Sequence, residues 1–486
     1  MSTIKDLAPQ AIFGNFELLT QIPRPSGHLE KIQQFLLDWA KKAGVEAWKD
    51  EAGNILMRKP ATPGMEDRQT AILQAHMDMV PQKGESSRHD FQNDPITTVV
   101  DGDWLKADNT TLGADDGIGV ASIMAVMEAK DLKHGPLEAL ITADEETGMF
   151  GAFGLKAGEL EGSILLNLDT EDEGELIIGC AGGLDVVASL QYKEEPTEKT
   201  DIAVKVSLSG LLGGHSGLEI GEGRANANKL MARFVRAAIT DDDARLVSWH
   251  GGNMRNAIPR QCSVVLAVPA ENKEDLMDLV AYCRKMFAEE FKDIETNGFE
   301  FVAEECELPA TQVPVEIQDN LVGAIYACRN GVMRYIPTIP HIVETSSNLA
   351  IIDIEGGSAK MAVLVRSASE SMKEYLATSL ECCFNMAGMK VEMSGDYSGW
   401  QPNTASPIVH AMTRSYEQQF GTPCKVQVVH AGLECGIISA VMPDLDMVSF
   451  GPTLRSPHTP QERCYIPSVE KYWSFLKATL EQIPLK

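Results

Sequence analysis

Five short segments carry side chains that could bind metal ions: His76-Met77-Asp78, Gly113-Ala114-Asp115-Asp116-Gly117, Asp144-Glu145-Glu146-Thr147-Gly148, Asn167-Leu168-Asp169 and Pro457-His458. Imidazole and carboxylate groups suit zinc and related divalent ions, and such a site needs no thiolate. Two histidines and three carboxylates can hold two metals if one carboxylate bridges them. Paired metals about 3.5–4 Å apart acidify a bound water and polarise a substrate carbonyl, so the chemistry indicated is hydrolysis.

Short apolar runs precede most of these segments and predict buried strands. They cover residues 71–75 before His76, 137–142 before Asp144, 164–168 before Asp169 and 448–450 before the loop of His458. A helix is predicted over 117–130, directly after Asp115-Asp116. Sites in open α/β sheets form beyond the carboxyl ends of the strands, so we expect these side chains to meet at one edge of a sheet.

Each segment alone also fits a structural role. A histidine at a strand end is more often a hydrogen-bonded structural residue than a ligand. Asp115 and Asp116 could cap the following helix, and Glu145-Glu146 could form a solvated turn. Asp169 opens an acidic run, Glu171-Asp172-Glu173, that we expect to be exposed. The joint occurrence of all five segments in this order favours a metal site.

The predicted elements divide the chain into two α/β domains. Residues 1–186 and 398–486 contain the candidate ligands, and we expect a catalytic domain with a central mixed, mostly parallel sheet. Residues 187–397 show a different order of elements. Predicted strands and helices alternate up to residue 303, and a similar succession of helices and strands then begins with a helix over 321–330. This order predicts an inserted α/β domain built from two similar halves.

Composition excludes several classes of protein. The 486 residues carry a formal net charge of −28, which argues against a nucleic-acid partner and against an anionic membrane surface. No apolar run approaches the roughly 18–20 residues of a membrane span, and no signal peptide is visible. Ten scattered cysteines without a C-x-x-C pair favour a reducing cytoplasm.

The five segments together resemble the metal motifs of the co-catalytic zinc peptidases, a family that includes aminoacylases, glutamate carboxypeptidases and dipeptidases. The resemblance covers nearly the whole chain, and it identifies the inserted domain as the family's lid. Three stretches narrow it to the cytosolic dipeptidases of aminoacyl-histidine: 80–83 (VPQK), 213–217 (GGHSG) and 432–436 (GLECG). It implies two divalent ions, foremost zinc with manganese or cobalt as alternatives, dipeptide substrates such as β-alanyl-histidine, and a homodimer.

The family's roles can be carried over residue by residue. His76, Asp115 and Asp169 would hold one metal, and Asp115, Glu146 and His458 the other, so that Asp115 bridges. Asp78 would orient His76. Glu145 would be the general base that takes a proton from water and passes it to the leaving amine.

The resemblance assigns further residues to the substrate. His215, in its glycine-rich loop, would help to stabilise the oxyanion. Asn256 and Arg366 match positions that bind the substrate's C-terminal carboxylate, and Glu434 would face its N-terminal ammonium. Arg366 could instead form a surface ion pair, and His215 could have no special role.

Two other functions fit parts of the pattern. An N-acyl amino-acid deacylase would share the metal chemistry and differ in the lid. A catalytically silent peptide- or metal-binding protein is disfavoured because Glu145 and the complete ligand set are present. A serine hydrolase and a thermolysin-like enzyme are disfavoured because the chain has no G-x-S-x-G and no H-E-x-x-H.

Overall fold

The computed structural model describes residues 4–486, which form two compact units. The first unit contains the chain up to Gly179, Trp400–Val428 and Leu433–Lys486, and the second contains Cys180–Gly399 with Val429–Gly432. The boundary expected after 186 lies seven residues beyond Gly179, and the boundary expected after 397 lies two residues before Gly399. The return of 429–432 to the second unit was not foreseen. No helix of residues 4–486 is both long and apolar enough to cross a membrane.

An eight-stranded mixed sheet forms the centre of the first unit as far as the chain is described, in the order β1-β2-β6-β3-β7-β23-β8-β22. Its strands are β1 (Glu46–Lys49), β2 (Ile55–Lys59), β3 (Ala71–His76), β6 (Leu137–Thr142), β7 (Ile164–Asn167), β8 (Glu175–Cys180), β22 (Lys425–Val429) and β23 (Asp446–Ser449). The four strands β6, β3, β7 and β23 run parallel, while β2 and β8 flank them antiparallel. The sheet is therefore parallel only at its centre, where the candidate ligands follow the strands.

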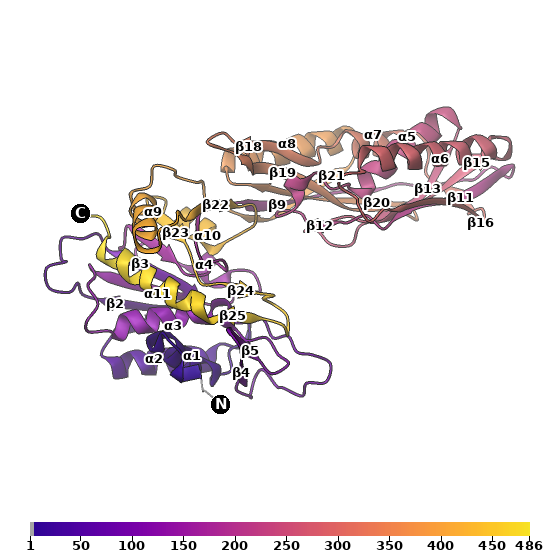
Figure 1. Cartoon of the computed structure of the whole chain (residues 1–486). Helices are drawn as coiled ribbons and strands as arrows, with labels where there is room; N and C mark the ends of the chain where they lie inside the picture. The colour runs from indigo at the N-terminus through magenta and orange to yellow at the C-terminus, as the bar shows by residue number, and fades with distance from the viewer. Residues whose placement is uncertain (1–3) are drawn as a thin grey trace. The chain divides into compact units, whose positions relative to one another are not determined.

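Helices cover this central region. All residues of β3 and β6 are buried, because apolar side chains on both faces of these strands are packed against other elements. Helix α3 packs against β3, and α1 packs on α3 (Figure 1). The helices of the first unit are α1 (Gln10–Thr20), α2 (Glu30–Ala43), α3 (Ala114–Glu128), α4 (Phe150–Gly154), α9 (Pro407–Phe420), α10 (Glu434–Val441) and α11 (Ile466–Glu481).

The first unit also contains a small four-stranded sheet, which supports the loop that carries His458. It contains β4 (Thr98–Asp101), β5 (Trp104–Ala107), β24 (Leu454–Arg455) and β25 (Arg463–Tyr465), in the order β24-β25-β5-β4 within residues 4–486. The segment that carries His458 connects β24 to β25 and is held at both ends by this antiparallel pairing.

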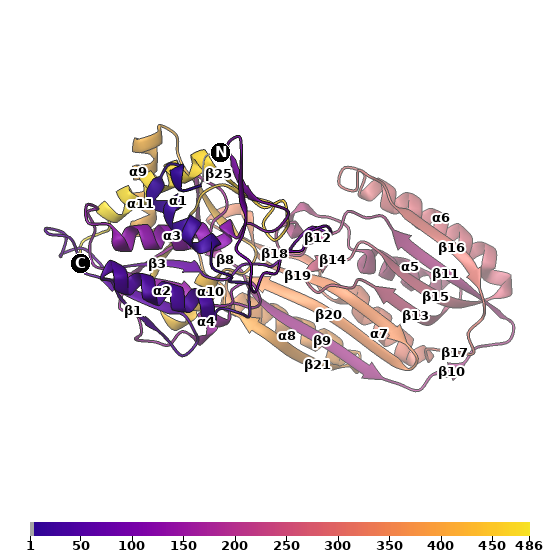
Figure 2. The same ribbon diagram turned by 90° about the horizontal axis from the view of Figure 1, so that it is seen from below.

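The second unit is a nine-stranded sheet, over the part of the chain described, with helices on one face only (Figures 1 and 2). Eight strands follow the order β16-β11-β15-β13-β19-β20-β9-β21, and β18 pairs with β19. They are β9 (Gly182–Gln191), β11 (Asp201–Ser209), β13 (Arg245–Gly251), β15 (Cys262–Pro269), β16 (Glu300–Cys306), β18 (Gly331–Ile336), β19 (Ile339–Glu355), β20 (Ser358–Ser367) and β21 (Lys390–Tyr397). The helices are α5 (Ala227–Asp241), α6 (Lys273–Glu290), α7 (Val315–Ala327) and α8 (Glu370–Met386).

The strand order repeats about the middle of this sheet. From the outer edge inward, β16-β11-β15-β13 is matched by β21-β9-β20-β19, and the halves meet where β13 pairs antiparallel with β19. Each half also contains a pair of helices, so the predicted two similar halves are found in the topology. The helix expected over 321–330 begins instead at Val315 after Pro314, and it ends at Ala327 because Cys328 is extended.

Candidate metal centre

The first unit brings the five predicted metal ligands together at the carboxyl ends of its parallel strands. His76 is the last residue of β3, Glu146 follows β6, and Asp169 follows β7. Asp115 lies in the first turn of α3, where its backbone is extended rather than helical, and His458 lies in the loop between β24 and β25. The strand ends therefore place side chains from distant parts of the sequence at one point.

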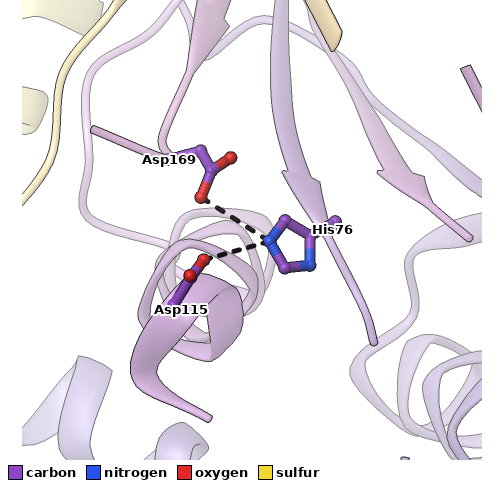
Figure 3. A group of neighbouring side chains, drawn as sticks. All are labelled: His76, Asp115 and Asp169. Atoms are coloured by element: carbon purple, nitrogen blue, oxygen red, sulfur yellow. Dashed lines mark hydrogen bonds and ion pairs between the residues drawn. The ribbon is translucent and has the colours of Figure 1, made fainter. Parts of the chain in front are cut away.

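The two carboxylate oxygens of Asp115, the residue predicted to bridge, face different histidines. Its Oδ1 lies 3.1 Å from Nε2 of His76, whose same nitrogen lies 3.6 Å from Oδ1 of Asp169 (Figure 3). Its other oxygen, Oδ2, lies 3.1 Å from Nε2 of His458, which also lies 2.9 Å from Oε2 of Glu146. Within each set of three residues, one ligand atom per residue lies within 4.8 Å of the others. Asp115 thus belongs to both sets through different oxygens.

The electrostatics of the centre favour cations. Although burial lowers the pKa of His76, the charge of Asp169 and hydrogen bonds to Asp115 and Asp78 raise it well above its ordinary value. Hydrogen bonds to Asp115 and Glu146 raise the pKa of His458 to about 10. Burial and neighbouring carboxylates raise the pKa of Asp169. Among the residues described, buried Oε1 of Glu146 has no hydrogen-bond partner. Closely packed carboxylates with an unused oxygen and two imidazoles fit a pair of divalent ions.

Asp78 connects the first imidazole to the loop that follows β6. Its Oδ1 lies 3.5 Å from Nδ1 of His76 and accepts the backbone N–H of Glu145 at 3.0 Å. Its Oδ2 accepts the hydroxyl of Ser26 at 2.7 Å and the N–H of Glu146 at 3.3 Å. This fully buried carboxylate is placed to orient a ligand and the candidate base together.

Glu145 lies beside the ligands and is half-buried. Burial, with the nearby charges of Glu434 and Glu146, raises its pKa to about 8. It also falls within a third possible metal-binding set with His76 and Glu146. Its position beside the two ligand sets fits a proton acceptor.

Glu434 lies beneath this region, at the start of α10. Its Oε2 accepts hydrogen bonds from Gln74 Nε2 at 2.6 Å and from Thr142 Oγ1 at 2.7 Å. Its Oε1 is buried and has no partner among residues 4–486. Burial raises its pKa to about 7. The unsatisfied oxygen is consistent with the predicted contact to an ammonium group, because such an oxygen is costly without a partner.

Around the ligands, one structural role that the sequence left open is found, one expectation is wrong, and two residues were missed. Of the neighbouring aspartates, Asp116 does cap the helix: its Oδ1 accepts the N–H of Gly119 at 3.1 Å. The run 171–173 is half-buried rather than exposed, because Glu173 accepts hydrogen bonds from Tyr416 and Lys471. The buried residues Arg24 and Glu462, which bind the backbone of the ligand loops, were missed.

The second unit holds the other predicted substrate residues. His215 Nδ1 accepts the backbone N–H of Leu218 at 3.1 Å. Nη2 of Arg366 lies 3.4 Å from Nε2 of the same ring, so the guanidinium and the imidazole lie next to each other. Burial and the charge of Arg366 lower the pKa of His215. Asn256 is exposed, and its carbonyl accepts the N–H of Ser216, next to His215.

Glycines allow this loop to pack closely. A Cβ atom at Gly217 would lie 2.1 Å from the carbonyl oxygen of His430, and Gly213 has a φ of +66°. The side chain of His430 lies under the loop, where its Nε2 is 2.7 Å from Ser346 Oγ. The loop that presents His215 is therefore fixed by backbone contacts that a larger residue would disrupt.

The chain is similar to a known protein family and to several characterised proteins. The model for "Peptidase family M20/M25/M40" matches residues 72–482. The cytosol non-specific dipeptidase of Escherichia coli (strain K12) is 41% identical over 486 residues, which cover all of both chains. The crystal structure of an aminoacylhistidine dipeptidase from Vibrio alginolyticus superposes with a TM-score of 0.96 at 43% identity, covering 100% of this chain and 99% of that one. A Staphylococcus aureus tripeptidase shares only the fold, with a TM-score of 0.55 at 16% identity over 98% of this chain and 99% of that one.

Proposed function

The chain belongs to peptidase family M20/M25/M40, and from that premise we propose that it is a metal-dependent dipeptidase. The observation that carries the proposal is the position of Asp115, whose two oxygens contact the two histidines of separate ligand sets with Glu145 alongside. The names of the Escherichia coli and Vibrio alginolyticus relatives support dipeptides as substrates, and the former supports the cytosol as the location.

The ligand sets would hold two divalent ions, for which we propose zinc. His76, Asp115 and Asp169 would bind one ion, and Asp115, Glu146 and His458 the other. When bound, the ions supply Lewis acidity towards water and the scissile carbonyl. Nitrogen and oxygen ligands also suit manganese and cobalt, which are the alternatives to zinc.

The chain's own residues would move the proton and position the substrate. Glu145 accepts a proton from the attacking water and returns it to the leaving amine. Its raised pKa makes it a better proton acceptor than an ordinary carboxylate. Asp78 keeps the loop of Glu145 and the ring of His76 in a fixed relationship.

The second unit would contribute the anion-binding groups. His215 and Arg366 lie next to each other, and with its Nε2 protonated the imidazole would join the guanidinium in donating to an oxyanion or a carboxylate. We assign the oxyanion to His215 and the C-terminal carboxylate of the dipeptide to Arg366 and Asn256. A histidine-containing dipeptide such as β-alanyl-histidine is the substrate that the family resemblance favours.

The homodimer implied by the resemblance is part of the proposal. The second unit contains two similar halves, and we propose that His215 of this doubled unit serves its own chain. Activity per subunit should then persist on dilution to a monomer. Activity that disappears in proportion to dissociation would instead indicate that a partner chain delivers His215.

The decisive experiment is hydrolysis of β-alanyl-histidine by the purified protein, after chelation and after zinc is restored. Activity that disappears and returns is expected. Parallel reactions with N-acetyl amino acids separate a dipeptidase from a deacylase of the same chemistry. Full activity in protein shown to be free of metal would overturn the mechanism, and turnover of N-acetyl amino acids alone would favour the deacylase.

A further inference from the structure

Glu462 is a buried carboxylate whose hydrogen bonds, within residues 4–486, all come from backbone N–H groups around the bridging ligand. It is 2% exposed and lies four residues after His458. Its Oε2 accepts the N–H groups of Leu112 at 2.8 Å and Gly113 at 3.0 Å. Its Oε1 accepts those of Ala114 at 2.7 Å and Asp115 at 3.2 Å. One side chain thus binds four consecutive amides that end at Asp115.

The loop of residues 458–462 contacts Asp115 at two points. His458 Nε2 lies 3.1 Å from its side-chain Oδ2, and Glu462 Oε1 accepts its backbone N–H. The N–H of Glu462 itself bonds to the carbonyl of Thr459, which closes the loop between these two contacts. The positions of the second histidine and of the shared carboxylate are therefore coupled through one short segment.

Arg24 complements this arrangement from the other side. This 3%-exposed guanidinium donates through Nη1 to the carbonyls of Met77 at 3.0 Å and Asp78 at 3.1 Å, and through Nη2 to that of Gly113. It joins the loop after His76 to the loop before Asp115. Gly113 permits the contact, because a Cβ atom there would lie 2.6 Å from Nη2 and the residue has a φ of +69°.

We propose that Glu462 is a positioning residue for the dinuclear centre, which holds the backbone of residues 112–115 so that Asp115 can contact both metal sites. The inference rests on the proposed metal-dependent function. An ordinary helix cap would satisfy the first amides of α3 and nothing more. Here the backbone of Asp115 and Asp116 is not helical. The carboxylate of Glu462, which accepts the backbone N–H groups of residues 112–115, therefore determines where the side chain of Asp115 points.

The test compares Glu462→Gln with Glu138→Gln. Glu138 is also buried and accepts two backbone amides, those of Glu161 and Gly162, but it lies at the start of β6, away from the centre. In the Glu462→Gln variant the side-chain NH2 group would face backbone N–H groups, because glutamine retains only one acceptor oxygen.

For Glu462→Gln we expect a 10–100-fold loss of cobalt affinity at one of two sites and an altered cobalt absorption spectrum. We expect a similar loss in kcat, with KM little changed. Glu138→Gln should lower thermal stability and leave all of these unchanged.

A Glu462→Gln protein with the wild-type cobalt affinity and spectrum would overturn the proposal, whatever its stability. Glu462→Asp retains the carboxylate and should recover part of the cobalt affinity. If Glu462→Gln does not fold, the aspartate variant decides: a perturbed spectrum supports the proposal, and a wild-type one refutes it. Cobalt titration needs no substrate, so wild-type protein that binds two ions but cleaves no dipeptide would refute the proposed function and leave this inference standing.

Discussion

Asp78 accepts the backbone N–H of Glu145 at 3.0 Å through the same oxygen that lies 3.5 Å from Nδ1 of His76. A single atom therefore links the orientation of a candidate metal ligand to the position of the candidate base. Because Asp78 is fully buried, water cannot replace either contact. A change at Asp78 would therefore affect both the orientation of His76 as a ligand and the position of Glu145 as a base.

Replacing Asp78 with Asn should lower kcat by about 10–100-fold, the usual scale for groups that orient a metal ligand. The amide keeps the volume but removes the charge that steadies His76, and it offers one acceptor oxygen where Asp78 has two. Steady-state kinetics and metal content measured on the same preparation check this. If the Asp78→Asn variant kept the wild-type kcat at full metal occupancy, the proposed role of Asp78 in orienting His76 and Glu145 would be wrong.

Replacing Glu145 with Gln should lower kcat by roughly 10²–10⁴-fold, because the proton acceptor is lost. Both metals should remain bound, since Glu145 belongs to neither of the two sets that share Asp115. It does lie within a third set with His76 and Glu146, so metal content is the informative control. Loss of one metal equivalent in the variant would make Glu145 a ligand rather than a base.

Replacing Glu434 with Gln should raise KM for dipeptides with a free amine by about tenfold or more, because hydrogen bonds to charged groups contribute about 1.5–3 kcal/mol. The Gln oxygen can still accept from Gln74 and Thr142, so the change is confined to the oxygen that has no partner in the described residues. Comparing free and N-acetylated dipeptides measures it. Equal KM values for wild type and variant, with a lower melting temperature, would assign Glu434 to structure alone.

The parts of the site that could be predicted are those with a local pattern. Residues 71–76 are apolar up to a histidine, so both the strand and the side chain at its end follow from the sequence. The halves of the second unit were indicated by the order of their elements, although the repeat itself lies in strand pairing and not in residue types. The boundary residues 429–432 could not be foreseen, because a short return between units depends on tertiary contacts.

The residues that were missed act on backbone far away in the sequence. Glu462 binds amides some 350 positions before it, and any acceptor of suitable length could satisfy them, so no residue pattern marks the contact. The one available signal was the proximity of Glu462 to His458. Asp115 and Asp116 are likewise alike in type, and only the extended backbone at Asp115 and the cap that Asp116 forms with Gly119 separate a ligand from a helix cap.

The stability of the second unit should fall below neutral pH because of His430. Burial, with the charges of Arg366 and His215, lowers the pKa of this 6%-exposed imidazole to about 3. In the unfolded chain its pKa is about 6.5. Between these values the unfolded state binds one more proton than the folded state. The free energy of unfolding therefore decreases by about 1.4 kcal/mol for each pH unit below about 6.5, and is unaffected above it.

Denaturant titrations at pH 7.5, 6.0 and 5.0 test this prediction with His430→Gln, whose amide can replace Nε2 as the partner of Ser346 Oγ. The variant should lose about 1.4 kcal/mol per unit of the pH dependence below pH 6.5. His341→Gln is the matched control, because His341 belongs to the same unit and is exposed. If wild type and His430→Gln show the same slope, the imidazole is protonated in the folded protein and its burial does not exclude the charge.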